Sequence, residues 1–290
     1  MGAGSDEPMP PGLPPEWQDW LAGNVARGCV DADLLATMRA QGFEEPYARV
    51  AIAVVRSMTE RVSRADPHLL DPYVADAPRL PDAARARAAD REVRLAVAVR
   101  DPNVALVDAL LAPEECDELV ALSAGKLERS EVVEADGQLA ASGVRTSRGT
   151  HFAPGEHPLV ARLESRIAAL TGIAPECGEP LQILHYGTGG EYLPHHDWFD
   201  AAQPGAARHL ERGGQRVATM VVYLNEVAAG GATVFPELGL SVRPRAGSAV
   251  YFEYMNRAGR VDARLLHAGA PVAAGEKWIA TKWLRQRPYR

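Results

Sequence analysis

The first part of the chain carries apolar residues at helical spacing. Leu34, Leu35 and Met38 would share one face of a helix that Asp31 can cap and Gly42 can end. Similar spacing, or a run of alanine and arginine with high helix propensity, predicts four helices over residues 16–24, 31–41, 46–64 and 83–92. We therefore expect a small N-terminal helical unit within residues 1–92.

Prolines interrupt this unit at two places. One cluster lies at the start of the chain and consists of Pro8, Pro10, Pro11, Pro14 and Pro15. A segment so rich in proline can neither complete a helix nor join a sheet, so an unstructured tail is expected there. The second cluster, within residues 65–82, predicts a linker.

From Val93 onward the pattern changes to short β-type segments separated by glycine and proline. Strands are expected on both sides of Asp101–Pro102, and amphipathic helices over residues 112–124 and 157–171. After Pro180, short apolar segments follow one another with regular turns. Such a series is typical of a barrel or jelly roll, which we place in residues 93–290 as an α+β domain.

Composition narrows the function classes. The 290 residues are 47% apolar and 24% charged, which allows a large core, and the formal net charge is −7. That charge argues against a nucleic-acid partner, and the lack of an 18-residue apolar run argues against a membrane span. The start of the chain lacks the basic and apolar regions of a signal peptide, and three separate cysteines make no disulfide framework. A cytoplasmic location is expected.

A candidate metal site lies in the segment EYLPHHDWFD. Because side chains alternate along a strand, His195 and Asp197 would point the same way and His196 the other. His267, 70 residues after Asp197, is the best third ligand. Two histidines and one carboxylate leave coordination positions open on iron(II), as oxygen-activating chemistry requires. On these residues alone, zinc hydrolases and cupins with other metals remain alternatives.

Lys277 adds a second candidate site ten residues after His267. A lysine directed into a barrel needs an anionic partner, and Glu276 would face the other way. A dicarboxylic co-substrate would supply the anion, with the hydroxyls of Thr219 and Tyr186 within reach of it. The alternative is that Lys277 leaves the barrel and reaches solvent.

At this point the sequence resembles a known family. The stretches LQILHYGTGGEYLPHHDWFD, RVATMVVYLNEVAAGGATVFPELG and LLHAGAPVAAGEKWIATKW resemble the catalytic domain of prolyl 4-hydroxylases in the iron(II)/2-oxoglutarate dioxygenase superfamily. Two upstream stretches, LAPEECDELVALS and GVRTSRGTHF, extend the resemblance to about 180 residues. It implies a double-stranded β-helix, or jelly roll, with helices packed on one side.

The resemblance also implies cofactors and site residues. It implies Fe(II) on His195, Asp197 and His267, with 2-oxoglutarate and O2 as co-substrates and ascorbate as a candidate reductant. The residues expected to hold the far carboxylate of 2-oxoglutarate are Lys277, Tyr186 and Thr219. Those expected on the substrate side are Arg145, Ser147 and Tyr254.

The resemblance implies hydroxylation of a prolyl residue in a peptide or protein. Two departures, Glu253 in the YFEYMN segment and the absence of a cysteine pair around His267, would touch the substrate side and put that specificity in doubt. The alternatives are a hydroxylase of a free amino acid or small metabolite, and a sensor or interaction module that binds iron and 2-oxoglutarate. A homodimer is a candidate assembly.

A long segment over residues 198–216 carries several glycines between two expected strands. Long loops of this kind in compact domains are often lids or binding loops. We predict that it closes over the substrate; the alternative is an exposed, variable loop.

Overall fold

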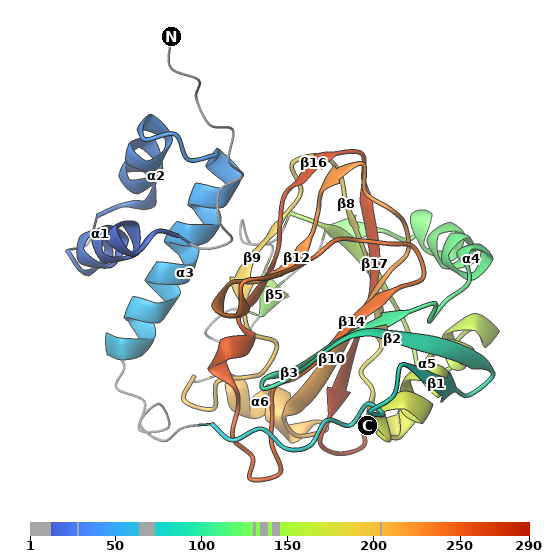
Figure 1. The fold of residues 1–290 in the computed structure, drawn as a ribbon. Helices are drawn as coiled ribbons and strands as arrows, with labels where there is room; N and C mark the ends of the chain where they lie inside the picture. Colours follow the sequence, from blue (N-terminus) through green and yellow to red (C-terminus); the bar gives the residue numbers. More distant parts are fainter. Residues whose placement is uncertain are drawn as a thin grey trace.

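Antiparallel sheets form the larger part of the protein, and three helices form a separate group near the N-terminus (Figure 1). The structure, a computed structural model, describes residues 13–27, 29–63, 73–129, 132–133, 139–140, 146–203 and 205–290. This is an α+β arrangement, as predicted. None of the described helices is both long enough and apolar enough to cross a membrane.

Nine strands form the main sheet in the order β1-β2-β3-β14-β10-β17-β8-β7-β4. They are β1 (Arg85–Ala88), β2 (Arg91–Arg100), β3 (Asn103–Asp108), β14 (Ala249–Glu253), β10 (Arg216–Tyr223), β17 (Lys277–Arg285), β8 (Leu181–Tyr186), β7 (Arg148–Phe152) and β4 (Glu128–Arg129). Neighbouring strands are all antiparallel. The helices α4 (Pro113–Ala124) and α5 (Pro158–Thr171) pack on one face, so both predictions for them are confirmed.

A second sheet faces the other side of the main sheet. Its order is β13 (Leu240–Val242), β12 (Thr233–Phe235), β15 (His267–Gly269) and β9 (Tyr192–His195). Short pairs are also formed by β11 (Ala229–Gly230) with β16 (Val272–Ala274) and by β5 (Val132–Val133) with β6 (Leu139–Ala140).

Alternation along the strands fills the space between the two sheets. On β10, Val221 and Tyr223 point toward the second sheet, whereas Met220 and Val222 pack under the helices. Phe235 of the second sheet packs edge-on against Phe252 of β14, with ring centroids 5.1 Å apart. The space between the sheets is therefore apolar, and a polar side chain there requires an explanation.

The N-terminal unit consists of α1 (Pro15–Ala26), α2 (Asp31–Ala40) and α3 (Glu45–Ser63), in agreement with the three predicted helices. Its core contains Leu21, Leu34, Met38 and Ile52. Asp31 is the first residue of α2 and not its cap, because Val30 occupies the capping position without a side-chain bond. Figure 1 shows α3 beside β9, and the two elements are in contact.

The helix predicted over residues 83–92 is wrong. These residues form β1, a turn and the start of β2, and the turn contains Ala89 with a φ of 51°. Strand pairing buries Ala88 and Val93 against the core, which outweighs the helix propensity of alanine and arginine. The main sheet therefore begins before residue 93, while the division of the chain into two domains stays a prediction.

Three predictions fall partly or wholly outside the described residues. They are the unstructured tail up to residue 12, the part of the linker over residues 65–72, and the position of Arg145.

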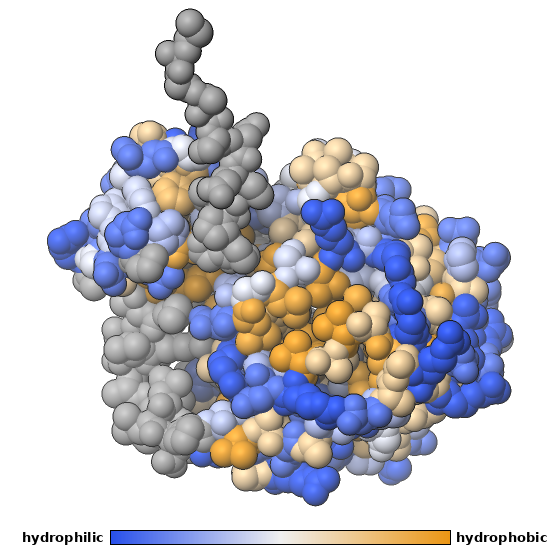
Figure 2. Space-filling view, viewed as in Figure 1, coloured by the Kyte–Doolittle hydropathy of each residue, from blue (hydrophilic) through white to orange (hydrophobic). Residues whose placement is uncertain are grey.

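Apolar side chains gather at the centre of the face shown in Figure 2, where β12, β14 and the β2–β3 hairpin lie in Figure 1. A surface groove of about 520 Å³ is lined there by residues that include Val97, Leu106 and Leu240. None of the three predicted iron ligands lines this groove. The candidate site lies instead between the two sheets.

Candidate metal centre and co-substrate pocket

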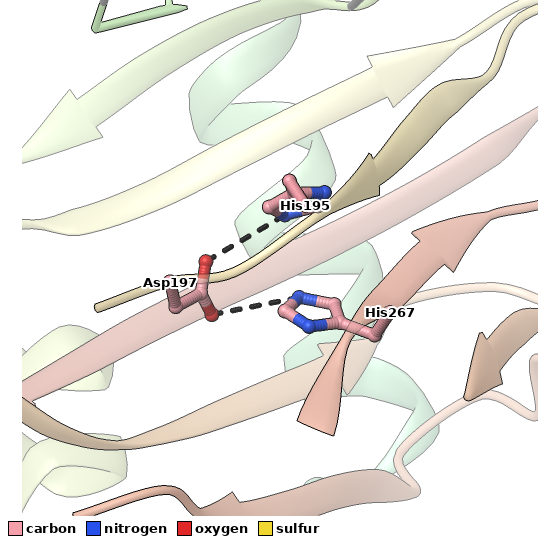
Figure 3. A group of neighbouring side chains, drawn as sticks. All are labelled: His195, Asp197 and His267. Atoms are coloured by element: carbon pink, nitrogen blue, oxygen red, sulfur yellow. Dashed lines mark ion pairs between the residues drawn. The ribbon is translucent and has the colours of Figure 1, made fainter. Parts of the chain in front are cut away.

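The three predicted metal ligands come together at the edge of the second sheet. His195 ends β9, and His267, which begins β15, is its direct partner in the register of the two strands. Asp197 follows β9, and the three side chains point toward one another (Figure 3). Nε2 of His195 and Nε2 of His267 each lie 3.6 Å from an oxygen of Asp197, and all three ligand atoms lie within 4.8 Å of one another.

Backbone carbonyls orient both imidazoles. Nδ1 of His195 lies 2.9 Å from the oxygen of Leu193, and Nδ1 of His267 lies 3.0 Å from the oxygen of Leu265. A carbonyl can only accept, so each Nδ1 carries the proton and each Nε2 offers its lone pair to a metal. His196 points the other way, with Nε2 3.0 Å from the oxygen of Ala263, as the strand alternation predicts.

Burial and neighbouring charges shift the pKa values of Asp197 and His267 toward the forms that bind a cation. Burial alone would raise the pKa of Asp197, but the neighbouring His267 and His195 and the guanidinium of Arg216 hold it well below its usual range. Burial, with His195 close by, lowers the pKa of His267 to about 4. Two neutral imidazoles and one carboxylate are the donor set of non-haem iron(II) oxygenases, so the residues fit Fe(II).

Asp197 is held by groups that were not predicted to touch it. The hydroxyl of Thr219 donates to Asp197 Oδ2 at 2.6 Å, and the hydroxyl of Tyr254 lies 3.1 Å from Thr219 Oγ1. Nη1 of Arg216 donates to the backbone oxygen of Asp197 at 3.2 Å. Thr219 thus holds one carboxylate oxygen of Asp197, and Arg216 holds the backbone of the same residue.

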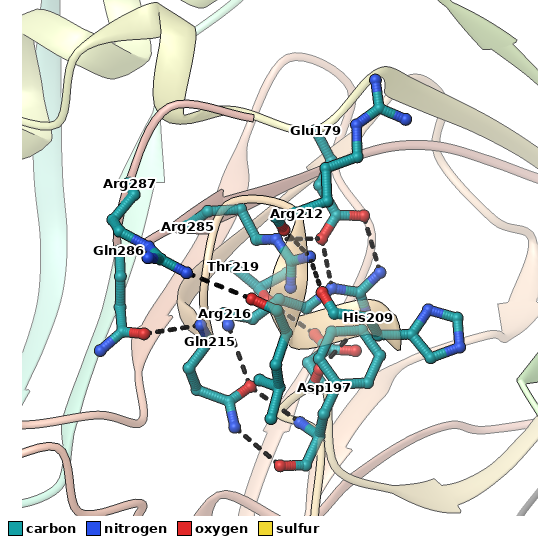
Figure 4. Close-up of polar contacts among 12 residues, drawn as sticks. Glu179, Asp197, His209, Arg212, Gln215, Arg216, Thr219, Arg285, Gln286 and Arg287 are labelled. Atoms are coloured by element: carbon teal, nitrogen blue, oxygen red, sulfur yellow. Dashed lines mark hydrogen bonds and ion pairs between the residues drawn. The ribbon is translucent and has the colours of Figure 1, made fainter. Parts of the chain in front are cut away.

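Arg216 is itself held by the buried carboxylate of Glu179 (Figure 4) and by an aromatic ring. Its guanidinium makes two bonds to Glu179, of 2.6 and 2.8 Å, and lies 3.9 Å from the ring centroid of Trp283. Arg285 approaches the same carboxylate at 3.3 Å. No sequence pattern indicates this network, because Glu179, Arg216 and Arg285 lie on three separate segments.

The segment over residues 198–216 is tied to the end of the main sheet. It contains α6 (Ala206–Glu211), whose end is held by Arg285 Nη2, which donates to the backbone oxygens of His209 and Arg212. Gln215 exchanges two hydrogen bonds with the backbone of Phe199. Closure of this segment over a substrate stays a prediction, and any such motion would have to preserve or break these bonds.

Lys277 begins β17 and points into the space between the sheets. Only 3% of its surface is exposed, so the alternative that it reaches solvent is wrong. Its ammonium lies 5.7 Å from the ring of Tyr186 and 5.9 Å from the ring of Tyr223, and burial lowers its pKa to about 8. No carboxylate among the residues that the structure describes forms an ion pair with it, and Glu276 pairs with His185 at 2.8 Å instead.

Two residues missed by the sequence reasoning lie beside Lys277. Tyr223 donates its hydroxyl to Thr233 Oγ1 at 2.8 Å. Thr233 pairs with Gly269, and a methyl group added at Gly269 would lie 3.9 Å from Lys277 Nζ. These polar groups line the same buried space as the unpaired ammonium.

The hydrogen bonds place Thr219 elsewhere than predicted. It precedes Tyr223 by two inward-facing positions on β10, which is about 13 Å along a strand. Thr219 therefore lies at Asp197. Thr233 lies beside Lys277, at the position where Thr219 was expected. Which threonine meets the lysine depends on strand register, and the sequence does not show that register.

The residues expected on the substrate side are only partly placed. Tyr254 is buried and bonded to Thr219, and Ser147 is buried directly before β7, at the level of Tyr186. The departure at Glu253 does not touch this side, because Glu253 faces away from the metal and accepts a bond from the backbone of Arg79 at 2.7 Å.

Comparisons with known proteins agree with this site. A family model, the 2OG-Fe(II) oxygenase superfamily, matches residues 181–285. Probable prolyl 4-hydroxylase 6 of Arabidopsis thaliana is 40% identical over 209 residues, which cover 65% of this chain and 70% of that protein. Prolyl 4-hydroxylase subunit alpha-1 of Gallus gallus is 38% identical over 179 residues, 61% of this chain and 34% of that protein.

A further relative and one solved structure also match this chain. Probable prolyl 4-hydroxylase 7 of Arabidopsis thaliana is 38% identical, and the chain spans 64% of its length. The 2OG complex of the viral collagen prolyl hydroxylase vCPH from Paramecium Bursaria Chlorella virus-1 matches with a TM-score of 0.50 and 28% identity, over 63% of this chain and 95% of that one. The chain belongs to the prolyl 4-hydroxylase-like branch of the 2OG-Fe(II) oxygenase superfamily.

Proposed function

We propose that this protein hydroxylates a prolyl residue in a peptide or protein, with Fe(II), 2-oxoglutarate and O2. The observation that carries the chemistry is the buried ammonium of Lys277, which has no carboxylate partner within the described parts of the chain and lies in the same space between the sheets as the three candidate metal ligands. A dicarboxylate can serve both sites at once, because one carboxylate pairs with the ammonium of Lys277 and the other end of the molecule binds the metal. The relatives named as prolyl 4-hydroxylases support the prolyl substrate.

The protein's own groups have separate tasks. Lys277 pairs with the far carboxylate of 2-oxoglutarate, and the hydroxyls of Tyr223 and Thr233 bind its oxygens. Thr219 and Arg216 hold Asp197 so that its carboxylate keeps one orientation toward the metal. Bound iron would supply the oxidation, in which one oxygen atom of O2 enters succinate as 2-oxoglutarate loses CO2 and the other is inserted into a C–H bond of the substrate.

The fold supports the same proposal. Two antiparallel sheets face each other, with the ligands on the smaller sheet and Lys277 on the larger. We infer that they form a double-stranded β-helix. In such a fold the metal and the co-substrate lie between rigid strands, which fixes their separation.

Succinate formation tests the proposal. Protein loaded with Fe(II) without oxygen is mixed with 2-oxoglutarate, O2 is admitted, and succinate is measured with and without a proline-rich peptide. We expect the peptide to stimulate succinate formation and to gain the mass of one oxygen atom on proline. Succinate without peptide stimulation would move the substrate to a small metabolite, and no succinate at all would refute an oxygenase.

Two lysine-region variants sharpen this assay. Lys277→Met removes the ammonium that meets the far carboxylate, so succinate should fall by at least a hundredfold at fixed 2-oxoglutarate. Glu276→Gln changes the adjacent residue, which faces away and contacts His185. It should leave the rate within about twofold of the unaltered protein.

A further inference from the structure

The main sheet extends further than the second sheet on the side of the surface groove. β3 and β2 continue the main sheet beyond β14, whereas the second sheet ends at β13. The groove of about 520 Å³ is lined by residues of β13, β14, β3 and β2. Within the described parts of the chain, no strand of the second sheet therefore lies beyond β13 to cover β3 and β2.

The side of the β2–β3 hairpin that faces this groove is apolar. Leu106 pairs with Val97 across the two strands, and Val104 pairs with Val99. Leu106 and Val99 pack against the cluster between the sheets, but Val97 is 43% exposed. Apolar side chains gather at this place in Figure 2. An apolar patch with a polar rim is typical of an interaction site.

The edge of β13 that borders the groove is open. β13 pairs with β12 on one side, where Ser241 is the partner of Val234, and with none of the described strands on the other. The opposite edge strand of the same sheet, β9, lies against α3 instead. Open N–H and C=O groups along an edge can bind an extended segment of another chain. A strand added beside β13 would lie in the groove, over Leu106 and Val97.

Arginines line the groove in excess over acidic residues. Arg94 and Arg245 approach different oxygens of Asp108, at 2.6 and 2.5 Å, so one carboxylate serves two guanidiniums. Arg243 forms no ion pair with any residue that the structure describes. Glu226 is the second carboxylate of the lining, so three arginines stand against two acids in a chain of net charge −7. This local excess favours an acidic partner.

We propose that the groove binds an extended, acidic segment of a partner protein, which adds as a strand to β13. Its apolar side chains pack on Val97 and Leu106, and its carboxylates pair with Arg243 and the neighbouring arginines. A second copy of this chain fits less well, because its own β13 edge would bring the same arginines into the groove. The proposal goes beyond the proposed function, because neither the candidate metal ligands nor Lys277 line the groove.

Peptide binding tests the choice of partner. The probes are two fluorescein-labelled peptides, one of alternating valine and glutamate and one of alternating valine and lysine. They are titrated with the full chain loaded with Mn(II) and 2-oxoglutarate, and fluorescence anisotropy is measured. We expect the dissociation constant of the glutamate peptide to be at least tenfold lower than that of the lysine peptide, and to rise with salt. Equal constants, or no binding of either peptide, would refute an acidic partner.

Three variants test the place of binding. Arg243→Glu should weaken binding of the glutamate peptide by at least tenfold, and Val97→Ser by at least threefold. The matched control Arg257→Glu changes an exposed arginine on a turn that does not line the groove, and should bind within about twofold of the unaltered protein. Succinate formation should stay within about twofold in all three, which shows an intact fold. An equal loss in Arg243→Glu and Arg257→Glu would mean that overall charge, and not the groove, attracts the peptide.

Backbone methylation tests strand addition. One glutamate peptide carries a methyl group on the backbone nitrogen of every valine, and another on that of every glutamate. Because N–H groups alternate between the two edges of a strand, each peptide has one edge blocked. We expect one of them to lose at least tenfold in affinity and the other to bind within about threefold of the unmethylated peptide. Equal affinities of the two would refute pairing with β13.

Sedimentation velocity tests the competing occupant. We expect the unaltered protein and Val97→Ser to have the same oligomeric state over a wide range of concentrations. A dimer that Val97→Ser dissociates would assign the groove to a second copy of the chain and overturn the proposal.

Discussion

At the scale of single residues, the buried Lys277 combines a proposed role in co-substrate binding with a cost in stability. Its charge is buried, and burial lowers its pKa from 10.5 to about 8. Below pH 8 both the folded and the unfolded chain carry this charge, so the folded protein bears the full penalty of burying it. Above pH 8 only the folded chain releases the proton, and the penalty declines toward pH 10.5.

The variant Lys277→Met should therefore be more stable than the natural protein in the absence of 2-oxoglutarate. We expect its free energy of unfolding to be higher by about 3 kcal/mol at pH 7, with this advantage declining above pH 8. Urea unfolding of both proteins at pH 7 and pH 9 would measure it. An equal or lower stability at pH 7 would mean that Lys277 has an anionic partner already.

Affinity for 2-oxoglutarate should depend on the same proton. A neutral lysine cannot pair with a carboxylate, so the dissociation constant should rise above pH 8, toward a limit of about tenfold per pH unit. Calorimetry with the Mn(II) protein from pH 7 to 9 would show the rise. Lys277→Arg keeps its charge over this range, so any affinity that it retains should not change with pH.

The two threonines should give different phenotypes. Thr233→Val removes a hydroxyl beside Lys277 and should weaken 2-oxoglutarate binding by about tenfold with little effect on the metal. Thr219→Val removes the bond to Asp197 and should weaken metal binding by about 10-fold to 100-fold. Separate titrations of Mn(II) and of 2-oxoglutarate would distinguish them, and a reversed pattern would restore the role first predicted for Thr219.

The three residues of the candidate metal site were predictable because each stands in a recognisable local pattern. The alternation of a strand places His195 and Asp197 together, and His267 stands alone in an apolar segment. The groups around them were not predictable. Arg216 lies 19 residues after Asp197 and meets its backbone only in the folded chain, and Tyr223 comes close to Lys277 only because β10 pairs with β17. Such contacts depend on register, which side-chain periodicity does not fix.

At the scale of elements, Arg166 joins α5 to the β1–β2 turn and to α4. Its side chain is 3% exposed and makes two bonds each to Asp90 and Glu115, between 2.7 and 2.9 Å long. This explains why residues 83–92 form a hairpin. Their local propensity favours a helix, but the hairpin places Asp90 at Arg166 and Ala88 in the core.

Arg166→Met should destabilise the protein by about 3–5 kcal/mol, because it leaves Glu115 largely buried without its main partner. Arg162→Met is the matched control: this arginine is 46% exposed and lies 3.6 Å from the same carboxylate, so its loss should change stability by less than about 1 kcal/mol. Chemical unfolding would measure both. Similar effects for the two variants would contradict a structural role specific to Arg166.

At the scale of the whole molecule, a metal bound at the candidate site would link two strands, β9 and β15, that are otherwise held by few bonds. β9 and β15 are short, and their register shifts between His267 and Gly269. At a hundredfold excess over the dissociation constant, bound metal should stabilise the fold by about 2.7 kcal/mol, or several degrees of melting temperature. Thermal unfolding with Mn(II) and with a chelator would show the difference. His267→Ala should lose it, and His196→Ala should keep it.

The contact between α3 and β9 has one more consequence. β9 is the last strand of the second sheet, and an open strand edge can pair with a strand of another molecule. Because α3 lies along this strand, the helical unit shields the edge from addition of a foreign strand. Ala48→Asp, which places a charge in the core of that unit, should therefore promote aggregation, measurable by light scattering. We therefore expect the N-terminal helices to limit strand addition at β9, the strand that carries the candidate ligand His195.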